Sequence, residues 1–231
     1  MLKYPVLILF LISFLYSCDT KKKVVDNSKN ENSIVVNTNT ELAVAGSFNF
    51  ESDQDLNIQS AILKNVMADK NGAYIGHKMD KLALYFKENM DYSELLRAGE
   101  GLILEIKNSD SFYFSTGKSD LNAISKKTLD VVVDAMLSNP KVNLIVEVHT
   151  DNKGSDEINL EMTKKRGQSI NAYFVDQGID AARLNVIALG ENFPKNESTS
   201  SDNLEDNRRV VFGFYASEAL KEEARMATES N

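Results

Sequence analysis

The sequence predicts an α/β fold, an α+β sandwich in which helices pack on one face of a mixed β-sheet. One observation behind this prediction is that strand-like and helical runs alternate after residue 100, in the order β-α-β-α-β-β. The other is that 42% of the 231 residues are hydrophobic, which is enough for one packed core with additional segments around it.

The stretch 54–90 is predicted to be helical, because apolar side chains recur in it every three or four residues: Ile58, Ile62 and Val66, then Ile75, Met79, Leu82 and Phe86. Such stripes are usually packing faces. His77 lies in this stretch without a second histidine or a cysteine nearby, so we expect no metal site there. The glycine-rich break at 99–101 and the apolar alternation over 102–106 then predict a hairpin that leads into a strand.

The later elements follow from periodicity and from the residues that end it, Asn139-Pro140 for one helix and Gly178 for the next. The predicted elements are a strand over 102–114, a helix over 120–138, a strand over 142–148, a helix over 155–177, and strands over 184–189 and 209–214. From Ala216 the chain is polar, and we expect this tail to fray.

The N-terminal residues are typical of a secretory signal. A basic residue precedes an apolar run over 5–16, which is shorter than the about 20 residues needed to span a bilayer. Charged residues end the run early, which disfavours the alternative of a membrane-anchor helix. The following Leu15-Tyr16-Ser17-Cys18 resembles a bacterial lipobox, which implies removal of residues 1–17 and lipidation of Cys18. Cys18 is also the only cysteine, so no disulfide forms within one chain.

These patterns divide the chain into five parts. We expect a signal peptide at 1–17, the lipidated cysteine with a flexible tether at 18–40, a helical N-terminal segment at 41–98, a domain at 99–215 and a polar tail at 216–231. The tether is predicted from its Asn, Ser, Thr and Lys content and its lack of a sustained period. The net charge of −8 argues against a nucleic-acid partner, which would require a basic face.

Residues 146–166 contain the most specific constellation in the chain. Asp151 follows an apolar strand, Arg166 lies on the next predicted helix, and Asn159 lies between them. One interpretation is an ion pair between these two residues of the chain; at a protein surface such a pair contributes about 0–1 kcal/mol. The other is a receptor for a zwitterion, with Asp151 accepting from an ammonium group and Arg166 binding a carboxylate through its planar fork of donors. Asn159 has both a donor and an acceptor to orient such a ligand. Residue types alone do not separate these interpretations.

The chain around this constellation resembles the OmpA-like, peptidoglycan-associating C-terminal domain over about residues 100–215. The matching motifs are His149-Thr150-Asp151, Gly154-Ser155, Asn159-Leu160, Arg166, Gly178-Ile179-Asp180, Arg183-Leu184, Gly190-Glu191, Pro194 and Asn207-Arg208-Arg209-Val210. The resemblance implies binding of the peptide stem of peptidoglycan at its diaminopimelate end group, without cleavage and without a cofactor. It implies Asp151 on the ammonium and Arg166 on the carboxylate, with Asn159 and Thr150 as supporting contacts. Arg208 or Arg209 would line the same pocket.

The chain departs from the family pattern in four places. Ser115 follows Phe114 where an acidic residue is frequent, and Val148 stands where a glycine usually precedes the histidine. Gly167 follows Arg166 where alanine is common, and Ala188-Leu189 replaces a glycine-aromatic pair. A glycine inside a helix costs about 1 kcal/mol relative to alanine. None of these changes removes Asp151 or Arg166.

Three functions are consistent with this reading. The first is a non-enzymatic tether in the cell outer membrane, held by lipid on Cys18, with the domain in the periplasm on peptidoglycan. The second is an envelope-assembly or motor-anchoring adaptor that binds a protein partner through residues 54–90. The third is a cell-wall hydrolase, which is disfavoured because the two histidines, His77 and His149, lack metal-ligand spacing and no Gly-x-Ser-x-Gly motif occurs.

The lipid anchor gives the first testable prediction. Cys18→Ser should leave the protein folded and release it from membranes, because several acyl chains give stable anchoring at about 0.8 kcal/mol per buried methylene. Membrane fractionation after a high-salt wash measures this. A variant that still sediments wholly with membranes would contradict the lipoprotein assignment.

Overall fold

A computed structural model describes residues 57–67, 69–90, 93–106, 114–115, 117–197 and 201–229 of the chain, with the side chains of 201–203 excepted. The predicted signal peptide, Cys18 and the predicted tether lie outside these residues. Within the described ranges, no helix is both long enough and apolar enough to cross a bilayer.

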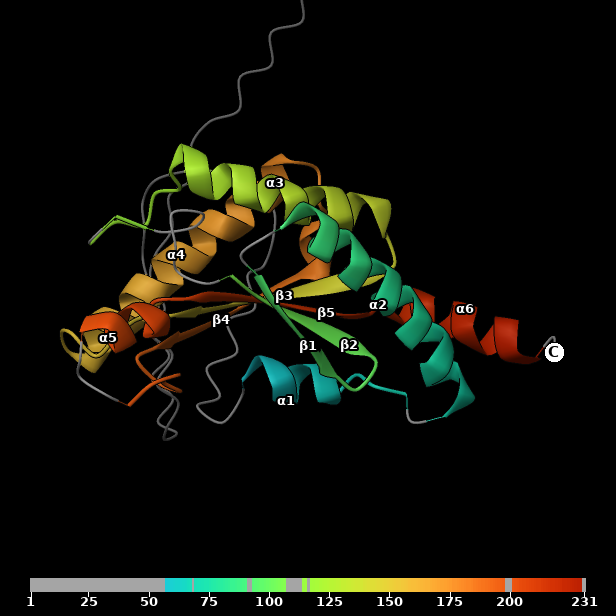
Figure 1. Cartoon of the computed structure of the whole chain (residues 1–231). Coiled ribbons are helices and arrows are strands. Elements are labelled where there is room, and N and C mark those ends of the chain that lie inside the picture. Colours follow the sequence, from blue (N-terminus) through green and yellow to red (C-terminus); the bar gives the residue numbers. More distant parts are fainter. Residues whose placement is uncertain are drawn as a thin grey trace, which may run out of the picture. The chain divides into compact units, whose positions relative to one another are not determined.

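The fold is built on one five-stranded mixed sheet with the strand order β1-β2-β5-β3-β4 (Figure 1). Only β3 and β4 pair in parallel, and the other three pairs are antiparallel. The strands are β1 (Ser93–Ala98), β2 (Gly101–Ile106), β3 (Val142–His149), β4 (Leu184–Gly190) and β5 (Val210–Ala216). The predicted hairpin at 99–101 is confirmed as the connection between β1 and β2.

The predicted order of strands and helices is confirmed. Helix α3 (Ala123–Ser138) connects β2 with β3, and α4 (Asp156–Asp176) connects β3 with β4. The predicted helical stretch 54–90 forms two helices, α1 (Ile58–Leu63) and α2 (Lys70–Asn89). Three further helical elements were not predicted: η1 (Ala181–Arg183), α5 (Ser201–Asn207) and α6 (Glu218–Glu229).

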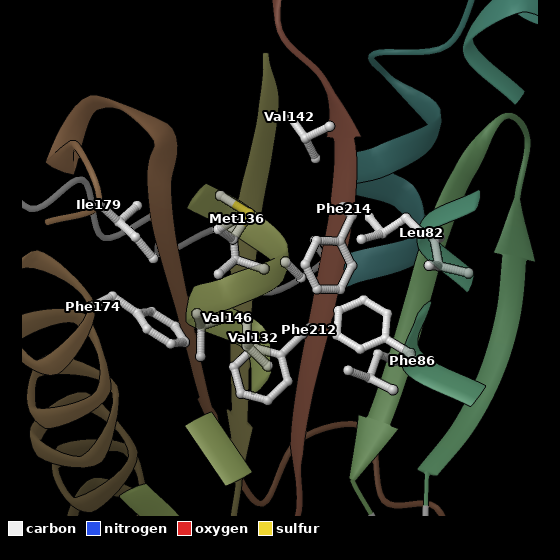
Figure 2. Close-up of a cluster of buried hydrophobic side chains, with 14 of the residues drawn as sticks. Leu82, Phe86, Val132, Met136, Val142, Val146, Phe174, Ile179, Phe212 and Phe214 are labelled. Atoms are coloured by element: carbon white, nitrogen blue, oxygen red, sulfur yellow. The ribbon is translucent and has the colours of Figure 1, made fainter. Parts of the chain in front are cut away.

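The main core lies between the sheet and the helices α2, α3 and α4. Figure 2 shows side chains from these helices meeting side chains of β3 and β5. Phe86 of α2 lies against Phe214, with ring centroids 5.1 Å apart, and Phe174 of α4 lies 6.1 Å from Phe212. The predicted stripe on α2 is a packing face, since its four members are buried: Ile75, Met79, Leu82 and Phe86.

Helix α1 packs on the opposite face of the sheet, so the helices do not all share one face (Figure 1). Ile58 and Ile62 are buried there against side chains of β2, β3 and β5. Two strand glycines make room for them. A Cβ at Gly101 would lie 2.3 Å from Ile62 Cγ2, and one at Gly213 would lie 2.6 Å from Ile58 Cγ1.

The C-terminal tail does not fray as expected, because most of it forms α6. Leu220 and Ala224 of this helix are buried in the main core. Glu223 accepts hydrogen bonds from Tyr74 Oη at 2.6 Å and Lys141 Nζ at 2.6 Å, and its carboxylate lies 3.1 Å from Lys78 Nζ. These contacts lower the pKa of Glu223 to about 2, with the bond from Lys141 as the largest cause.

The attachment of α6 should therefore depend on pH. A carboxyl group whose pKa is lower in the folded state stabilises the fold above its unfolded pKa, and this stabilisation is lost as the pH falls from about 4.5 to about 2. Because the side chain is 26% exposed, we expect a contribution of only about 1 kcal/mol or less. Glu223→Gln should destabilise the protein at neutral pH, and its difference from the parent in urea unfolding should shrink on acidification.

The matched control is Glu222→Gln, since Glu222 is also on α6 but pairs only with Arg225 three residues later, at 2.8 Å. A difference between the parent and Glu223→Gln that stays constant with pH would contradict the assignment.

Candidate functional site

The predicted site residues lie where β3 ends and α4 begins. The Thr150 N–H donates to the Gly190 carbonyl at 2.7 Å, which joins the ends of the parallel strands β3 and β4. Gly190 has a φ of +57°, and a Cβ there would lie 3.0 Å from the backbone nitrogen of Leu160, so this approach of strand end to helix requires glycine. Ser155 caps α4 by accepting from the Ile158 N–H.

Asp151 forms an ion pair, but with Arg208 and not with Arg166. Arg208 Nη1 donates to Asp151 Oδ2 at 2.6 Å, and Asp151 Oδ1 accepts from the Lys153 N–H at 3.1 Å. Asp151 is 7% exposed, so the expectation of an exposed pair is also wrong. The pair is partly desolvated, which strengthens the charge-assisted hydrogen bond that joins it.

Arg166 is buried and has no carboxylate within 4.0 Å among the residues that the structure describes. Its Nε donates to the Lys118 carbonyl at 3.1 Å, and its guanidinium carbon lies 4.9 Å from the centre of the Phe114 ring. Burial lowers the pKa of Arg166, the neighbouring Arg208 lowers it further, and Asp151 opposes both. The guanidinium is therefore held in place by a carbonyl and a ring, with its charge only partly compensated.

Asn159 and Thr150 complete the cluster. Asn159 Nδ2 donates to the Asp151 carbonyl at 3.2 Å and to Glu191 Oε2 at 2.6 Å. The hydroxyl oxygen of Thr150 is buried and has no hydrogen-bond partner in the part of the chain that the structure describes. A buried polar atom without a partner costs about 1–3 kcal/mol, so such an atom is often explained by a ligand or by water.

The two neighbouring arginines separate in the structure. Arg208 joins the cluster, whereas Arg209 donates from Nη2 to the Phe193 carbonyl at 3.0 Å. Burial lowers the pKa of Arg209, and the carboxylates of Glu147 and Glu105 oppose this shift. The contacts described for Arg209 thus place it with Glu147 and not with Asp151 or Arg166.

Three residues of the cluster were missed by sequence reasoning: Phe114, Lys118 and Glu191. Glu191 follows Gly190 in a motif that was recognised, but nothing in the sequence shows that its carboxylate meets Asn159. Lys118 contributes a carbonyl, which any residue type supplies. Nothing in the sequence around Phe114 shows that its ring lies against Arg166.

One of the departures from the family pattern, Gly167, permits a close approach of α4 to the sheet. A Cβ at Gly167 would lie 2.4 Å from Val186 Cγ1, whereas its distance of 3.7 Å from Val148 Cγ2 is an ordinary contact. Gly167 therefore makes room for Val186 of β4, and the valine at 148 does not require it. The glycine costs helix propensity but permits this packing.

His149 lies next to the cluster and is part of a chain of polar contacts. His149 lies 2.6 Å from Glu147 through Nε2 and 3.2 Å from the Asn192 carbonyl through Nδ1, so both ring nitrogens are already engaged. Across the described ranges, no group of three or more His, Cys, Asp or Glu residues is arranged to hold a metal ion. The cluster of Asp151, Arg166 and Arg208 instead offers charges of both signs within one partly buried region.

Comparisons with known proteins agree with the resemblance drawn from the motifs. Residues 113–208 match the OmpA family, and this stretch is an OmpA-family domain. Over 141 residues the chain is 26% identical to the Escherichia coli (strain K12) protein named "Probable lipoprotein YiaD", covering 60% of this chain and 64% of that protein. Over 125 residues it is 28% identical to the peptidoglycan-associated lipoprotein of Pseudomonas putida, covering 53% of this chain and 75% of that protein.

A solved structure of a MotB-like protein from Desulfovibrio vulgaris has the same fold. It aligns with a TM-score of 0.54 and 21% sequence identity, and the alignment covers 69% of this chain and 99% of that one. The fold class predicted from the sequence is therefore shared with this protein.

The ion pair between Asp151 and Arg208 gives a stability prediction. Arg208→Ala leaves the Asp151 carboxylate buried without its partner, so we expect a loss of about 1–3 kcal/mol in urea unfolding. Relief of repulsion with Arg166 acts in the opposite direction and keeps the effect in the lower part of this range. Combining Arg208→Ala with Asp151→Asn should recover part of the loss, as a double-mutant cycle would show.

Arg225→Ala is the matched control, because Arg225 pairs with Glu222 on the surface of α6. It should lower the free energy of unfolding much less than Arg208→Ala does, because an exposed ion pair contributes little. Equal effects of Arg208→Ala and Arg225→Ala would contradict the burial of the pair with Asp151.

Proposed function

We propose that the OmpA-family domain binds the peptide stem of peptidoglycan at its diaminopimelate end group and tethers the outer membrane to the cell wall. The family match and the name of the Pseudomonas putida relative support a peptidoglycan ligand. Lipid on Cys18 would supply the membrane attachment, and the domain would lie in the periplasm. Binding without cleavage agrees with relatives that are named as lipoproteins and porins.

The observation that carries this proposal is the partly compensated charge of Arg166. Two guanidinium groups, those of Arg166 and Arg208, lie close enough to repel, and Asp151 forms its direct ion pair with only one of them. A ligand carboxylate beside Arg166 would compensate the remaining charge through a charge-assisted hydrogen bond, which contributes about 1.5–3 kcal/mol.

The ammonium of the same end group needs an acceptor, and the site offers two carboxylates. Asp151 and Glu191 are joined through Asn159, whose amide donates to the Asp151 carbonyl and to the Glu191 carboxylate. The Thr150 hydroxyl provides a further polar atom beside them. One carbon atom bearing both an ammonium and a carboxylate could therefore satisfy groups on both sides of the cluster.

Because the protein would be attached at two points, weak binding by the pocket would be sufficient to hold the outer membrane to the cell wall. If residues 18–40 are flexible, their r.m.s. span is about 25 Å by the square-root rule for such linkers. A domain confined in this way meets its ligand at a high effective concentration, so the overall attachment exceeds the affinity of the pocket alone.

An envelope-assembly or motor-anchoring adaptor is the second candidate, and the fold shared with a MotB-like protein is consistent with it. The apolar stripes of α1 and α2 are buried inside the domain, so a protein partner would have to contact their outward sides. Leu84, which is 57% exposed on α2, lies on such a side. Pull-down with and without Leu84→Glu tests this candidate.

The test of the proposed function is sedimentation with purified sacculi that contain diaminopimelate. Arg166→Ala should weaken binding about tenfold to a hundredfold, since one charge-assisted contact corresponds to one to two decades of affinity. Arg166→Lys should also weaken binding, because lysine keeps the charge but loses the planar fork and the stacking on Phe114. Free diaminopimelate should compete with the sacculi for the parent.

Arg225→Ala removes the same charge far from the cluster and should bind sacculi like the parent. Thermal unfolding of each variant shows that it is folded under the conditions of the sedimentation assay. Unchanged sedimentation of Arg166→Ala would exclude Arg166 as a ligand contact, and release of soluble fragments from the sacculi would favour a hydrolase.

A further inference from the structure

Helix α1 is a short element held by docking alone. It has only six residues, whereas isolated helices need about 12–15 residues even to be marginally stable in water. Its side chains Ile58 and Ile62 occupy the space above Gly101 and Gly213, where any Cβ would overlap them. The docked position is therefore specific, and it depends on contacts with the sheet.

A chain of hydrogen bonds runs from α1 through the sheet. The Ile58 N–H, at the start of α1, donates to Glu147 Oε2 at 2.5 Å, and Glu147 Oε1 lies 2.6 Å from His149 Nε2. The other ring nitrogen, Nδ1, lies 3.2 Å from the Asn192 carbonyl. Glu147 and His149 are 3% and 2% exposed, which shields these bonds from water.

The chain of bonds ends at the loop of residues 190–193, which also contributes to the candidate site. Glu191 in this loop accepts the hydrogen bond from Asn159, and the Gly190 carbonyl accepts from Thr150. Phe193 has a φ of +59°, a left-handed conformation that is unfavourable for a bulky residue. Arg209 binds the Phe193 carbonyl, so the strained loop depends on neighbouring contacts.

We infer that α1 is a latch: its docking on the second face of the sheet holds, through Glu147 and His149, the loop 190–193 that supports the ligand cluster. Undocking of α1 removes the Ile58 donor from the buried Glu147 carboxylate and opens that face to water. Glu147 and His149 then lose the geometry that fixes the Asn192 carbonyl. Because coupling between two sites is reciprocal, ligand binding should in turn stabilise docked α1.

The chain of bonds links α1 to the loop that holds Glu191, and through Glu191 to Asn159 of the candidate site. The effect on ligand affinity rests on the proposed function, whereas the coupling between α1 and the loop does not.

The test is amide hydrogen exchange by NMR on the full chain carrying Cys18→Ser. Gly213→Ala should displace α1, since the three atoms nearest to the added methyl, at 2.6–2.9 Å, belong to Ile58 and Ile62. The Ala61 amide, which donates to the Asn57 carbonyl at 2.9 Å, reports undocking, and the Asn192 amide, which donates to Leu189 at 3.0 Å, reports the loop. Both should exchange about tenfold faster than in the parent. Ile62→Ala, which leaves the sheet unchanged, should produce a smaller increase in the same direction at both amides.

Two controls separate coupling from general destabilisation. Gly76→Ala makes the same substitution on α2, where a Cβ would lie no closer than 3.4 Å to the end of the Arg97 side chain, and should change neither amide. The Gly178 amide, which donates to Val175 at 2.9 Å beyond the far end of α4, should keep its exchange rate in every variant.

The inference fails if α1 undocks while Asn192 keeps its protection, if Gly178 accelerates as much as Asn192, or if neither variant displaces α1. Sedimentation of Gly213→Ala with sacculi then measures whether the undocking of α1 changes ligand binding. Weaker binding than the parent supports the latch on a functioning site, and unchanged binding in an undocked variant contradicts its effect on the ligand. If the parent itself does not bind sacculi while α1 and Asn192 remain coupled, the proposed function fails and the latch stands.

Discussion

The parallel pairing of β3 with β4 is the constraint on which the candidate site depends. Parallel strands need a crossover, and α4 supplies it by packing across both strands. This arrangement brings the ends of β3 and β4 to one edge and lays the first half of α4 over them. Gly167 permits the helix to approach Val186, and Gly190 permits the strand end to approach the helix backbone. Asp151, Asn159 and Arg166 become neighbours for this reason, although they are spread over sixteen positions of the sequence.

Charge then distinguishes this edge from an ordinary strand end. Asp151 is engaged by Arg208 from the start of β5, while Arg166 is held by a carbonyl and by the Phe114 ring. Two guanidinium groups lie close together in a partly buried region, so repulsion and desolvation both act against the folded state there. The carboxylates of Asp151 and Glu205 pair with Arg208 and not with Arg166. A group perturbed by burial and by a neighbouring charge in this way is a candidate for a functional site.

The sequence could predict most of the elements, because periodic burial is recorded in local patterns. The apolar stripe of α2 and the apolar runs of β3 and β5 predict these elements without any information on the segments that pack against them. Long-range geometry could not be predicted. The position of α1 depends on two glycines on different strands, Gly101 and Gly213, and the partner of Asp151 is 57 residues away. Helix α6 was missed because only Leu220 and Ala224 of it are buried, and the rest of its sequence is polar.

The structure brings together five of the predicted site residues, Asp151, Asn159, Thr150, Arg166 and Arg208, and their role in ligand binding stays a prediction. Arg208 and Arg209 both precede β5, and the sequence could not show which of them meets Asp151. Arg209 is influenced instead by the charge of Glu147, and Glu147 accepts a hydrogen bond from Ile58 of α1.

The central claim is that one ligand carbon bearing an ammonium and a carboxylate satisfies both signs of charge in this cluster. Calorimetric titration of the Cys18→Ser protein with diaminopimelate and with pimelate, which has the same two carboxylates but no amino group, tests it directly. The zwitterion account predicts that the parent binds diaminopimelate about tenfold more tightly or better, and that Asp151→Asn abolishes this preference. Equal affinity of the parent for the two compounds would contradict the account.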